Sequence, residues 1–464
     1  MIFLICLGSL TCLYIAIVFW LHYKYPELHW NWDKIDISKM NFPDNFSWGT
    51  ATASHQVEGD CTNNNWYMWE NAKDENNKPR IKDGQKAGAA CDHWNRYKED
   101  IKLIKKIGVT QYRFSLEWSK IEAKKGSYDQ NVINHYSDVI DVLIQENITP
   151  VITLHHFTNP IWFDRLGGFE KEENINHFVS FCKVVFEKYS PRVKDWCTIN
   201  EPEVYSVMGY FAGIFPPGKK EPQLAVEVLK NLLIAHTTVY NSLKNLPNGK
   251  DSKIGIVKNI MQFDPYRRWN LLDWIVCRIT NKIYNDVALS YLEKGFINVN
   301  YPFFIKLNYQ CEKAALATDF FGLNYYSHSH LKFKFDSYEF FENKFFSHDI
   351  MTDMPYVIYP EGLYRAIKQA EKINKPIIIT ENGIADSKDD RRSLFIERYI
   401  YAMNKAIQEG SNVEGYFYWS LMDNFEWAEG YDMRFGLYEV NFENQERILR
   451  KGSYKFVDII NEFK

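Results

Sequence analysis

The chain alternates between short apolar runs rich in β-branched and aromatic residues and longer stretches in which apolar residues recur every three or four positions. The first pattern is typical of strands and the second of amphipathic helices. Helices are predicted over 97–108 and 135–147, each with a Gly or Asn near its end. Eight strands are predicted, at 46–51, 111–116, 149–155, 193–199, 253–259, 319–326, 376–380 and 415–420.

Several of these strands are apolar at successive positions, as parallel strands are when helices cover both faces of the sheet. Eight strand–helix units over about 420 residues predict an α/β fold, a single (β/α)8 TIM barrel with long βα loops. An open doubly wound sheet is the alternative, but its glycine-rich phosphate turn is missing from residues 51–59, ATASHQVEG. Residues 41–464 are therefore predicted to form one domain.

The first twenty residues, MIFLICLGSLTCLYIAIVFW, carry no charge and are long enough to span a bilayer as a helix. The basic n-region, short apolar core and cleavage site of a signal peptide are not evident. We therefore predict a single-pass transmembrane anchor over residues 1–21, followed by a polar and aromatic stalk over 22–40. Two alternatives stay open: a cleaved signal sequence, which would make the protein secreted, and a buried N-terminal helix of a soluble chain.

The side of the membrane is only weakly indicated. Lys24 follows the apolar run, and the positive-inside rule would place it on the cytoplasmic side. The N-x-[ST] sequons at Asn45 and Asn147 point instead to a secretory compartment. We therefore slightly favour a lumenal or extracellular barrel over a cytosolic one.

The balance of charges gives no reason to expect a nucleic-acid partner, because 55 Lys and Arg stand against 59 Asp and Glu for a net charge of -4. The eight cysteines include no Cys-x-x-Cys pair or Cys/His cluster, so their spacing does not indicate zinc. Neither a disulfide pattern nor an oligomeric state is predicted.

Polar side chains stand at the predicted carboxyl ends of the strands, where a TIM barrel places its catalytic groups. Glu201 follows the fourth strand, and Glu381 follows the seventh. Ring closure would bring these two ends to face each other across the barrel mouth. Two carboxyls that flank one bond, one protonated and one ionised, are the equipment of glycoside hydrolysis. We therefore expect Glu201 and Glu381 to act as a pair.

Eight short strings carry a family resemblance. They are, in chain order, HQVEG (55–59), YRFSLEW (112–118), TLHHFTNP (153–160), TINEP (198–202), GLNYY (322–326), IYPEGL (358–363), ITENG (379–383) and YWSLMDNFEWAEGYDMRFGL (418–437). From about Phe42 to the C-terminus the chain resembles glycoside hydrolase family 1, the β-glucosidase family. The resemblance implies a retaining β-glycosidase that hydrolyses terminal β-D-glucosides, with β-galactosides and β-fucosides as secondary substrates and without a metal or organic cofactor.

The resemblance also implies roles for single residues. Glu201 matches the general acid/base, and Glu381 matches the nucleophile. Arg113 carries a permanent positive charge that lowers a neighbouring carboxylate pKa, so Glu381 is expected to stay ionised. Arg113, Asn324 and Tyr326 are the expected nucleophile support. The expected substrate-binding residues are Gln56, His156, Asn200, Trp419, Glu426, Trp427 and Phe435.

The acidic Glu426 implies an unphosphorylated substrate, because a carboxylate would repel a phosphate. Phe157 stands where most members carry Trp, which leaves the leaving-group preference open. Small β-glycosides and glycolipids are both candidate substrates. Two other functions stay open: a membrane-anchored transglycosylase with lipid or sterol acceptors, and a non-catalytic glycan receptor like the family's klotho-like members.

Overall fold

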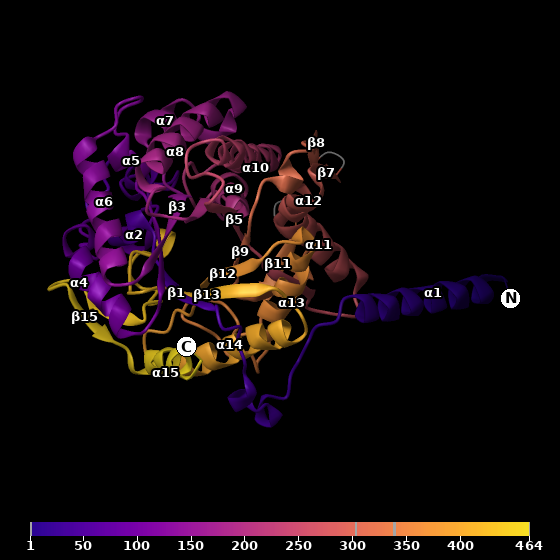
Figure 1. The fold of residues 1–464 in the computed structure, drawn as a ribbon. Coiled ribbons are helices and arrows are strands. Elements are labelled where there is room, and N and C mark those ends of the chain that lie inside the picture. The colour runs from indigo at the N-terminus through magenta and orange to yellow at the C-terminus, as the bar shows by residue number, and fades with distance from the viewer. Residues whose placement is uncertain (1, 302–303, 337–339, 464) are drawn as a thin grey trace.

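The computed structural model describes residues 2–301, 304–336 and 340–463. Its centre is a closed barrel of eight parallel strands, in which each strand pairs with the next barrel strand along the chain (Figure 1). The barrel strands are β1 (Ser47–Ala51), β2 (Gln111–Ser115), β3 (Thr149–His155), β4 (Asp195–Asn200), β5 (Lys253–Asn259), β9 (Phe321–Asn324), β12 (Ile377–Asn382) and β13 (Val413–Trp419). The predicted (β/α)8 barrel is confirmed.

Two of the eight predicted strands differ from the structure by two residues at their carboxyl ends, where the other six agree within one residue. The sixth is shorter, because β9 stops at Asn324, two residues before the predicted end. The seventh is longer, because β12 continues to Asn382 through pairing of Glu381 with Asn324 and of Asn382 with Tyr418. A register shift between Ile379 and Glu381 interrupts the β12–β9 ladder at this point. The tertiary pairing therefore places Glu381 within the strand end.

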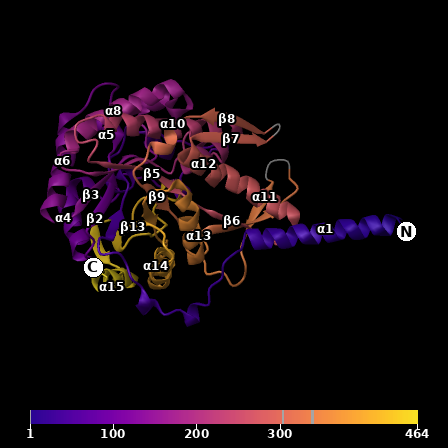
Figure 2. The ribbon, with the colours of Figure 1, turned by 45° about the vertical axis from the view of Figure 1, so that its right-hand side comes forward.

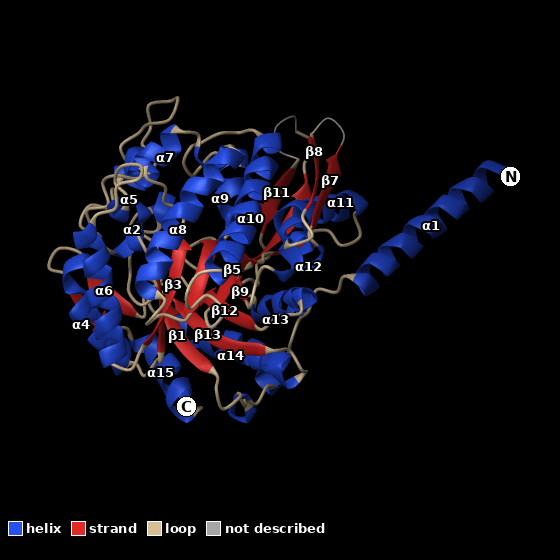
Figure 3. Ribbon diagram, turned by 45° about the horizontal axis from the view of Figure 1, so that its top comes forward, coloured by secondary structure: helices blue, strands red, loops and turns tan. Residues whose placement is uncertain are grey.

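Helices surround the barrel on its outer side (Figure 3). Both predicted helices begin earlier than their apolar pattern, since α4 begins at His93 and α6 at Gln130. For α6 the reason is the cap: the Asp129 side chain accepts from Asn131 N at 2.8 Å. The outer helices are α4 (His93–Lys106), α6 (Gln130–Gln145), α8 (Ile175–Tyr189), α10 (Pro222–Lys244), α12 (Val287–Lys294), α13 (Pro360–Ala370), α14 (Arg392–Gln408) and α15 (Tyr454–Glu462).

The long βα loops contain short elements of their own. Three small sheets lie outside the barrel: β11-β10-β6, β7-β8 and β14-β15. Their strands are β6 (Gln262–Pro265), β7 (Phe296–Tyr301), β8 (Ile305–Gln310), β10 (His328–Phe333), β11 (Phe341–Lys344), β14 (Tyr438–Asn441) and β15 (Glu446–Leu449). The loop helices are α2 (Ser54–Val57), α3 (Asn65–Glu70), α5 (Trp118–Ile121), α7 (Ile161–Arg165), α9 (Pro202–Ser206) and α11 (Leu271–Asn281).

The N-terminal helix α1 (Ile2–Lys24) projects away from the barrel (Figure 1, Figure 2). Its stretch Cys6–Lys24 has a mean hydropathy of 1.6, and only 6% of it is buried against the rest of the protein. Near its end, His22 Nε2 lies 2.9 Å from the Arg268 carbonyl oxygen. The helix is thus long and apolar enough to cross a membrane. A signal sequence near the N-terminus meets the same criteria.

The segment expected to be a stalk lies against the barrel wall. Trp30 N and Trp32 Nε1 donate to Glu361 Oε1 at 2.9 and 3.1 Å, at the start of α13. The two indole rings also pack against Tyr401 of α14 at centroid distances of 6.0 and 5.7 Å. These residues therefore do not form a free-standing spacer, because their side chains contact α13 and α14.

Trp118 tests how the loops depend on packing around the barrel. Its side chain is 1% exposed and packs against Phe163 and Phe181, at ring centroid distances of 4.7 and 5.1 Å. Trp118→Ala should lower the free energy of unfolding by about 3–5 kcal/mol, as truncation of a buried aromatic usually does. Urea denaturation measures it, with Leu316→Ala as control, since Leu316 is 73% exposed. Equal effects of the two variants would contradict this packing.

Candidate active site

A cavity of about 330 Å³ opens at the carboxyl ends of the barrel strands. Eight of the twelve predicted site residues line it: His156, Glu201, Tyr326, Glu381, Trp419, Glu426, Trp427 and Phe435. The other four lie directly behind these and form hydrogen bonds with them: Gln56, Arg113, Asn200 and Asn324. The structure therefore brings all twelve predicted residues together at one place.

Glu381 is held by a cation and a phenol. Arg113 Nη1 donates to Glu381 Oε1 at 2.6 Å, and Tyr326 Oη donates to Oε2 at 2.7 Å. The Arg113 side chain is 1% exposed, so water does not screen this ion pair. Each carboxylate oxygen thus has a fixed donor, and the side chain is oriented from both sides.

Glu201 is the residue at which the fourth strand becomes a helix. Its backbone is left-handed, with φ 45°, and Pro202 begins α9 immediately after it. The Glu201 N–H donates to the Val257 carbonyl at 2.8 Å and so still pairs with β5. Its Oε1 accepts from Asn324 Nδ2 at 2.8 Å and Asn259 Nδ2 at 3.0 Å. In contrast to Glu381, its hydrogen-bond partners among the described residues are neutral amides.

Asn200 links the surroundings of the two carboxyls. Its Oδ1 accepts from Arg113 Nη2 at 2.7 Å and from Asn324 Nδ2 at 3.3 Å. Its Nδ2 lies 3.2 Å from His156 Nε2. Asn200 and its three partners are all buried. Their hydrogen bonds therefore form in a medium of low polarity, where they orient the side chains strongly.

Burial raises the pKa of Glu201 to about 8, and the charges of Glu381 and Glu203 add to this, so Glu201 holds a proton at neutral pH. Burial also raises the pKa of Glu381, although Arg113 and Tyr326 oppose the rise. The expectation that Arg113 would leave Glu381 with a depressed pKa is therefore wrong, because burial outweighs the cation. The two carboxyls differ in that only Glu381 has a cation in direct contact.

Beside the cavity, Gln56 Nε2 donates to Glu426 Oε2 at 3.1 Å. Gln56 Oε1 has no hydrogen-bond partner among the described residues. The ring of His156 stacks with those of Trp419 and Trp427, at centroid distances of 5.7 and 6.0 Å. Apolar ring faces beside a few polar atoms are typical of a site that binds a sugar.

Burial and the neighbouring Glu381 raise the pKa of Glu426 to about 8. A mostly protonated Glu426 repels a phosphate less strongly than an ionised carboxylate would. A different observation now bears on phosphate binding: among the described residues that line the cavity, none is a lysine or arginine.

Several cavity residues are not among the predicted ones. Asn259 ends the fifth strand, so the strand-end rule that led to Glu201 and Glu381 would have found it. Tyr284, Met354 and Tyr356 also line the cavity and come from segments with no strand-end signal. Glu203, which is buried and lies 3.4 Å from Lys258 Nζ, adds a charged pair beside the Glu201 motif that the sequence did not indicate.

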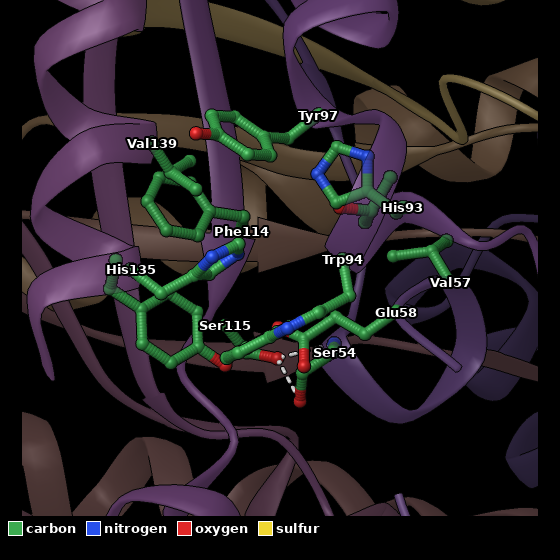
Figure 4. A pocket seen from close by; sticks show the side chains of 12 residues that line it. Ser54, Val57, Glu58, His93, Trp94, Tyr97, Phe114, Ser115, His135 and Val139 are labelled. Atoms are coloured by element: carbon green, nitrogen blue, oxygen red, sulfur yellow. Dashed lines mark hydrogen bonds between the residues drawn. The ribbon is translucent and has the colours of Figure 1, made fainter. Parts of the chain in front are cut away.

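A second, much smaller cavity of about 10 Å³ lies beside β2, with Ser54, His93 and His135 around it (Figure 4). In it Ser115 Oγ donates to Ser54 Oγ at 3.0 Å. A space of this size holds at most one water molecule. It is therefore not a binding site for a substrate.

Comparison with known proteins agrees with this geometry. The family model of glycosyl hydrolase family 1 matches residues 38–464. The chain is 34% identical over 452 residues to β-glucosidase A of Thermotoga maritima, covering 90% of this chain and 97% of that protein. The chain belongs to glycosyl hydrolase family 1.

Other members of family 1 resemble the chain closely. A structure of Thermotoga maritima β-glucosidase in complex with deoxynojirimycin superposes with a TM-score of 0.82 at 33% identity, over 91% of this chain and 99% of that one. The 6-phospho-β-galactosidase of Clostridium acetobutylicum is 32% identical over 91% of this chain and 98% of that protein. The protein is thus a β-glycosidase, an O-glycosyl hydrolase.

The buried Glu201 should make stability depend on pH. Its pKa is about 8 in the folded protein against an ordinary value of 4.5, so the folded state binds more protons between these values and loses stability as pH rises. Glu201→Gln should therefore raise Tm relative to wild type by an amount that grows from pH 4.5 to about 8. Thermal unfolding at a series of pH values measures this. The exposed Glu443→Gln is the control, and a pH-independent difference for Glu201→Gln would contradict the raised pKa.

Proposed function

We propose that this family 1 member hydrolyses terminal, non-reducing β-D-glucosides with retention of configuration, using Glu381 as nucleophile and Glu201 as general acid/base. The observation that carries the proposal is the asymmetry of two buried carboxyls in one cavity: Arg113 contacts Glu381, while neutral amides contact Glu201. A retaining reaction needs this division of roles.

In the first step, a carboxylate oxygen of Glu381 attacks the anomeric carbon while Glu201 gives its proton to the departing glycosidic oxygen. This forms a covalent glycosyl-enzyme ester and releases the aglycone. In the second step, Glu201, now ionised, takes a proton from a water molecule whose oxygen attacks the same carbon and displaces Glu381. Arg113 and Tyr326 hold Glu381 in position throughout and balance its charge when it leaves.

The residues in and beside the cavity favour a glycoside without phosphate. Gln56 and Glu426 would bind adjacent sugar hydroxyls, and the free Gln56 Oε1 is an acceptor for one of them. Trp419 and Phe435 would provide the apolar walls, and Asn200 would meet the 2-hydroxyl. The absence of lysine and arginine among the described lining residues favours an unphosphorylated sugar, with β-galactosides and β-fucosides as weaker substrates.

The lining of the cavity also favours an apolar aglycone. Met208, Met354, Tyr284 and Tyr356 line it and offer side chains that adapt to ring or chain shapes. Arylglycosides and glycolipids both present such a group. Transfer of the sugar to an alcohol acceptor would use the same residues and is an outcome of product analysis.

We also propose that residues 1–21 remain as a single-pass anchor and that residues 41–464 form the catalytic domain. The exposed side chain of Trp269, just before α11, supports this, because the Trp269 carbonyl oxygen accepts a hydrogen bond from Tyr14 Oη of α1. Tyr14 lies inside the apolar run, six residues or about 9 Å of helix before its last residue, Trp20. If α1 spans a bilayer, the exposed Trp269 side chain beside Tyr14 therefore contacts the lipid.

The two carboxyl variants should separate the catalytic roles. Glu201→Gln should lower kcat/KM by about 10²–10⁴-fold for a poor leaving group and far less for an activated aryl β-D-glucoside, which needs little protonation. Glu381→Gln should abolish turnover of both substrates. Proton NMR of the wild-type reaction should show the β-anomer of the sugar first.

Azide provides an independent check on the assignment. With Glu381→Ala, azide should fill the space of the missing carboxylate and give the α-glycosyl azide, while with Glu201→Ala it should give the β-azide. The opposite products would exchange the two roles. The distant, exposed Glu443→Gln serves as the activity control.

The anchor has its own test in the native host membrane. Mass spectrometry of the mature protein should find residues 2–24, and the protein should stay in the pellet after an alkaline carbonate wash. Both sequon asparagines, Asn45 and Asn147, are exposed, so a lumenal barrel should lose mass on treatment with an N-glycosidase. A mature N-terminus beyond Trp20 would show a cleaved signal sequence instead. No mass loss would place the barrel in the cytosol or leave the sequons unused.

A further inference from the structure

Three potential metal ligands from distant parts of the chain meet outside the active site. His328 and His330 stand two residues apart on β10, so their side chains leave the same face of the strand. Their Nε2 atoms lie 3.3 Å from each other. Glu27, which follows α1, faces both rings, with its Oε1 2.7 Å from His330 Nε2 and 3.7 Å from His328 Nε2.

The protons available cannot satisfy this arrangement by hydrogen bonds alone. A neutral imidazole carries one N–H, and the short contact uses that of His330 to donate to Glu27. His328 Nε2 then faces a second nitrogen whose proton is already used, at 3.3 Å, and an oxygen at 3.7 Å, which is beyond hydrogen-bond range. Both histidines are buried, with side chains 2% and 3% exposed, so bulk water does not complete the set. A cation between the three atoms would use all their electron pairs.

We propose that Glu27, His328 and His330 bind one divalent transition-metal ion of the zinc class. Zinc binds imidazole nitrogen at about 2.0–2.1 Å and carboxylate oxygen at about 2.0–2.2 Å, so ligand atoms at tetrahedral angles lie roughly 3.3–3.5 Å apart. The separation of the two nitrogens matches this edge, and the longer oxygen contact is close to it. Only the His330–Glu27 contact must lengthen when the proton gives way to the metal.

The groups around the site define what it can bind. Two nitrogen ligands favour zinc, cobalt or nickel over calcium or magnesium, which take oxygen ligands. Arg268 Nη1 lies 3.4 Å from Glu27 Oε2, so that oxygen stays with the guanidinium and Oε1 faces the metal. The Nδ1 atoms of both rings are buried and have no hydrogen-bond partner among the described residues. Because no acceptor holds these two Nδ1–H groups and the Arg268 cation lies nearby, the metal affinity is limited.

The ion would act as a clamp between two parts of the protein. Glu27 belongs to the segment that follows α1, whereas the histidines belong to the sheet β11-β10-β6 on the barrel. Metal binding would therefore fix the origin of the apolar helix relative to the barrel. This role is independent of the sugar chemistry, so it stands whether or not the proposed catalytic function is correct.

Cobalt(II) is the probe for this site, since its visible absorption reports the ligand set. The full chain in detergent, stripped of metal with a chelator, should bind one equivalent of Co²⁺ and develop the d–d bands of a low-symmetry nitrogen and oxygen site, which one equivalent of Zn²⁺ removes. All eight cysteines are free, so sulfur ligation must be distinguished. Sulfur-to-cobalt charge-transfer bands in place of this spectrum would overturn the proposal, as would the absence of any d–d band in the wild-type protein.

Two ligand variants and one control test the assignment. Glu27→Gln, which keeps the shape of the side chain, and His330→Gln should each weaken Co²⁺ binding at least about 10-fold. The matched control is Glu361→Gln, because Glu361 holds the same segment through Trp30 N but lies outside the ligand set. It should retain the d–d spectrum and the rise in Tm on addition of Zn²⁺. Unchanged binding in Glu27→Gln, or its equal loss in Glu361→Gln, would contradict the assignment.

Discussion

The buried ion pair between Arg113 and Glu381 is the interaction on which the site depends. Arg113 comes from β2 and Glu381 from β12, and the guanidinium also donates to Asn200 at the end of β4. One side chain thus joins three strands that are far apart in the sequence. Breaking such a pair leaves an uncompensated buried charge, so the barrel must close correctly around it.

Burial, more than any single neighbour, decides the acidity of the site. It raises the pKa values of Glu201, Glu381 and Glu426 together, and repulsion from Glu381 raises those of Glu201 and Glu426 further. Arg113 opposes this only at Glu381. The same low-polarity cavity therefore contains two carboxyls in different surroundings, one that holds a proton and one in direct contact with a cation.

The N-terminal region makes contacts with the barrel domain that its composition does not indicate. Trp30 and Trp32 pack on the outer helices, and Glu27 meets two histidines of β10. The apolar helix α1 thus projects from a segment fixed at several points. A barrel held in this way would keep a constant orientation towards whatever surface α1 enters.

The sequence by itself predicted the eight strands and the barrel, because apolar runs mark buried parallel strands. The strand-end rule pointed to Glu201 and Glu381, whereas the other ten expected site residues followed from the resemblance to family 1. The sequence did not determine the ends of β9 and β12, which depend on pairing between Glu381 and Asn324. Only the tertiary structure decided the raised pKa of Glu381, since burial depends on every neighbouring element. The meeting of Glu27 with His330, 303 residues away, likewise needed the folded chain, because no local pattern encodes such a distant contact.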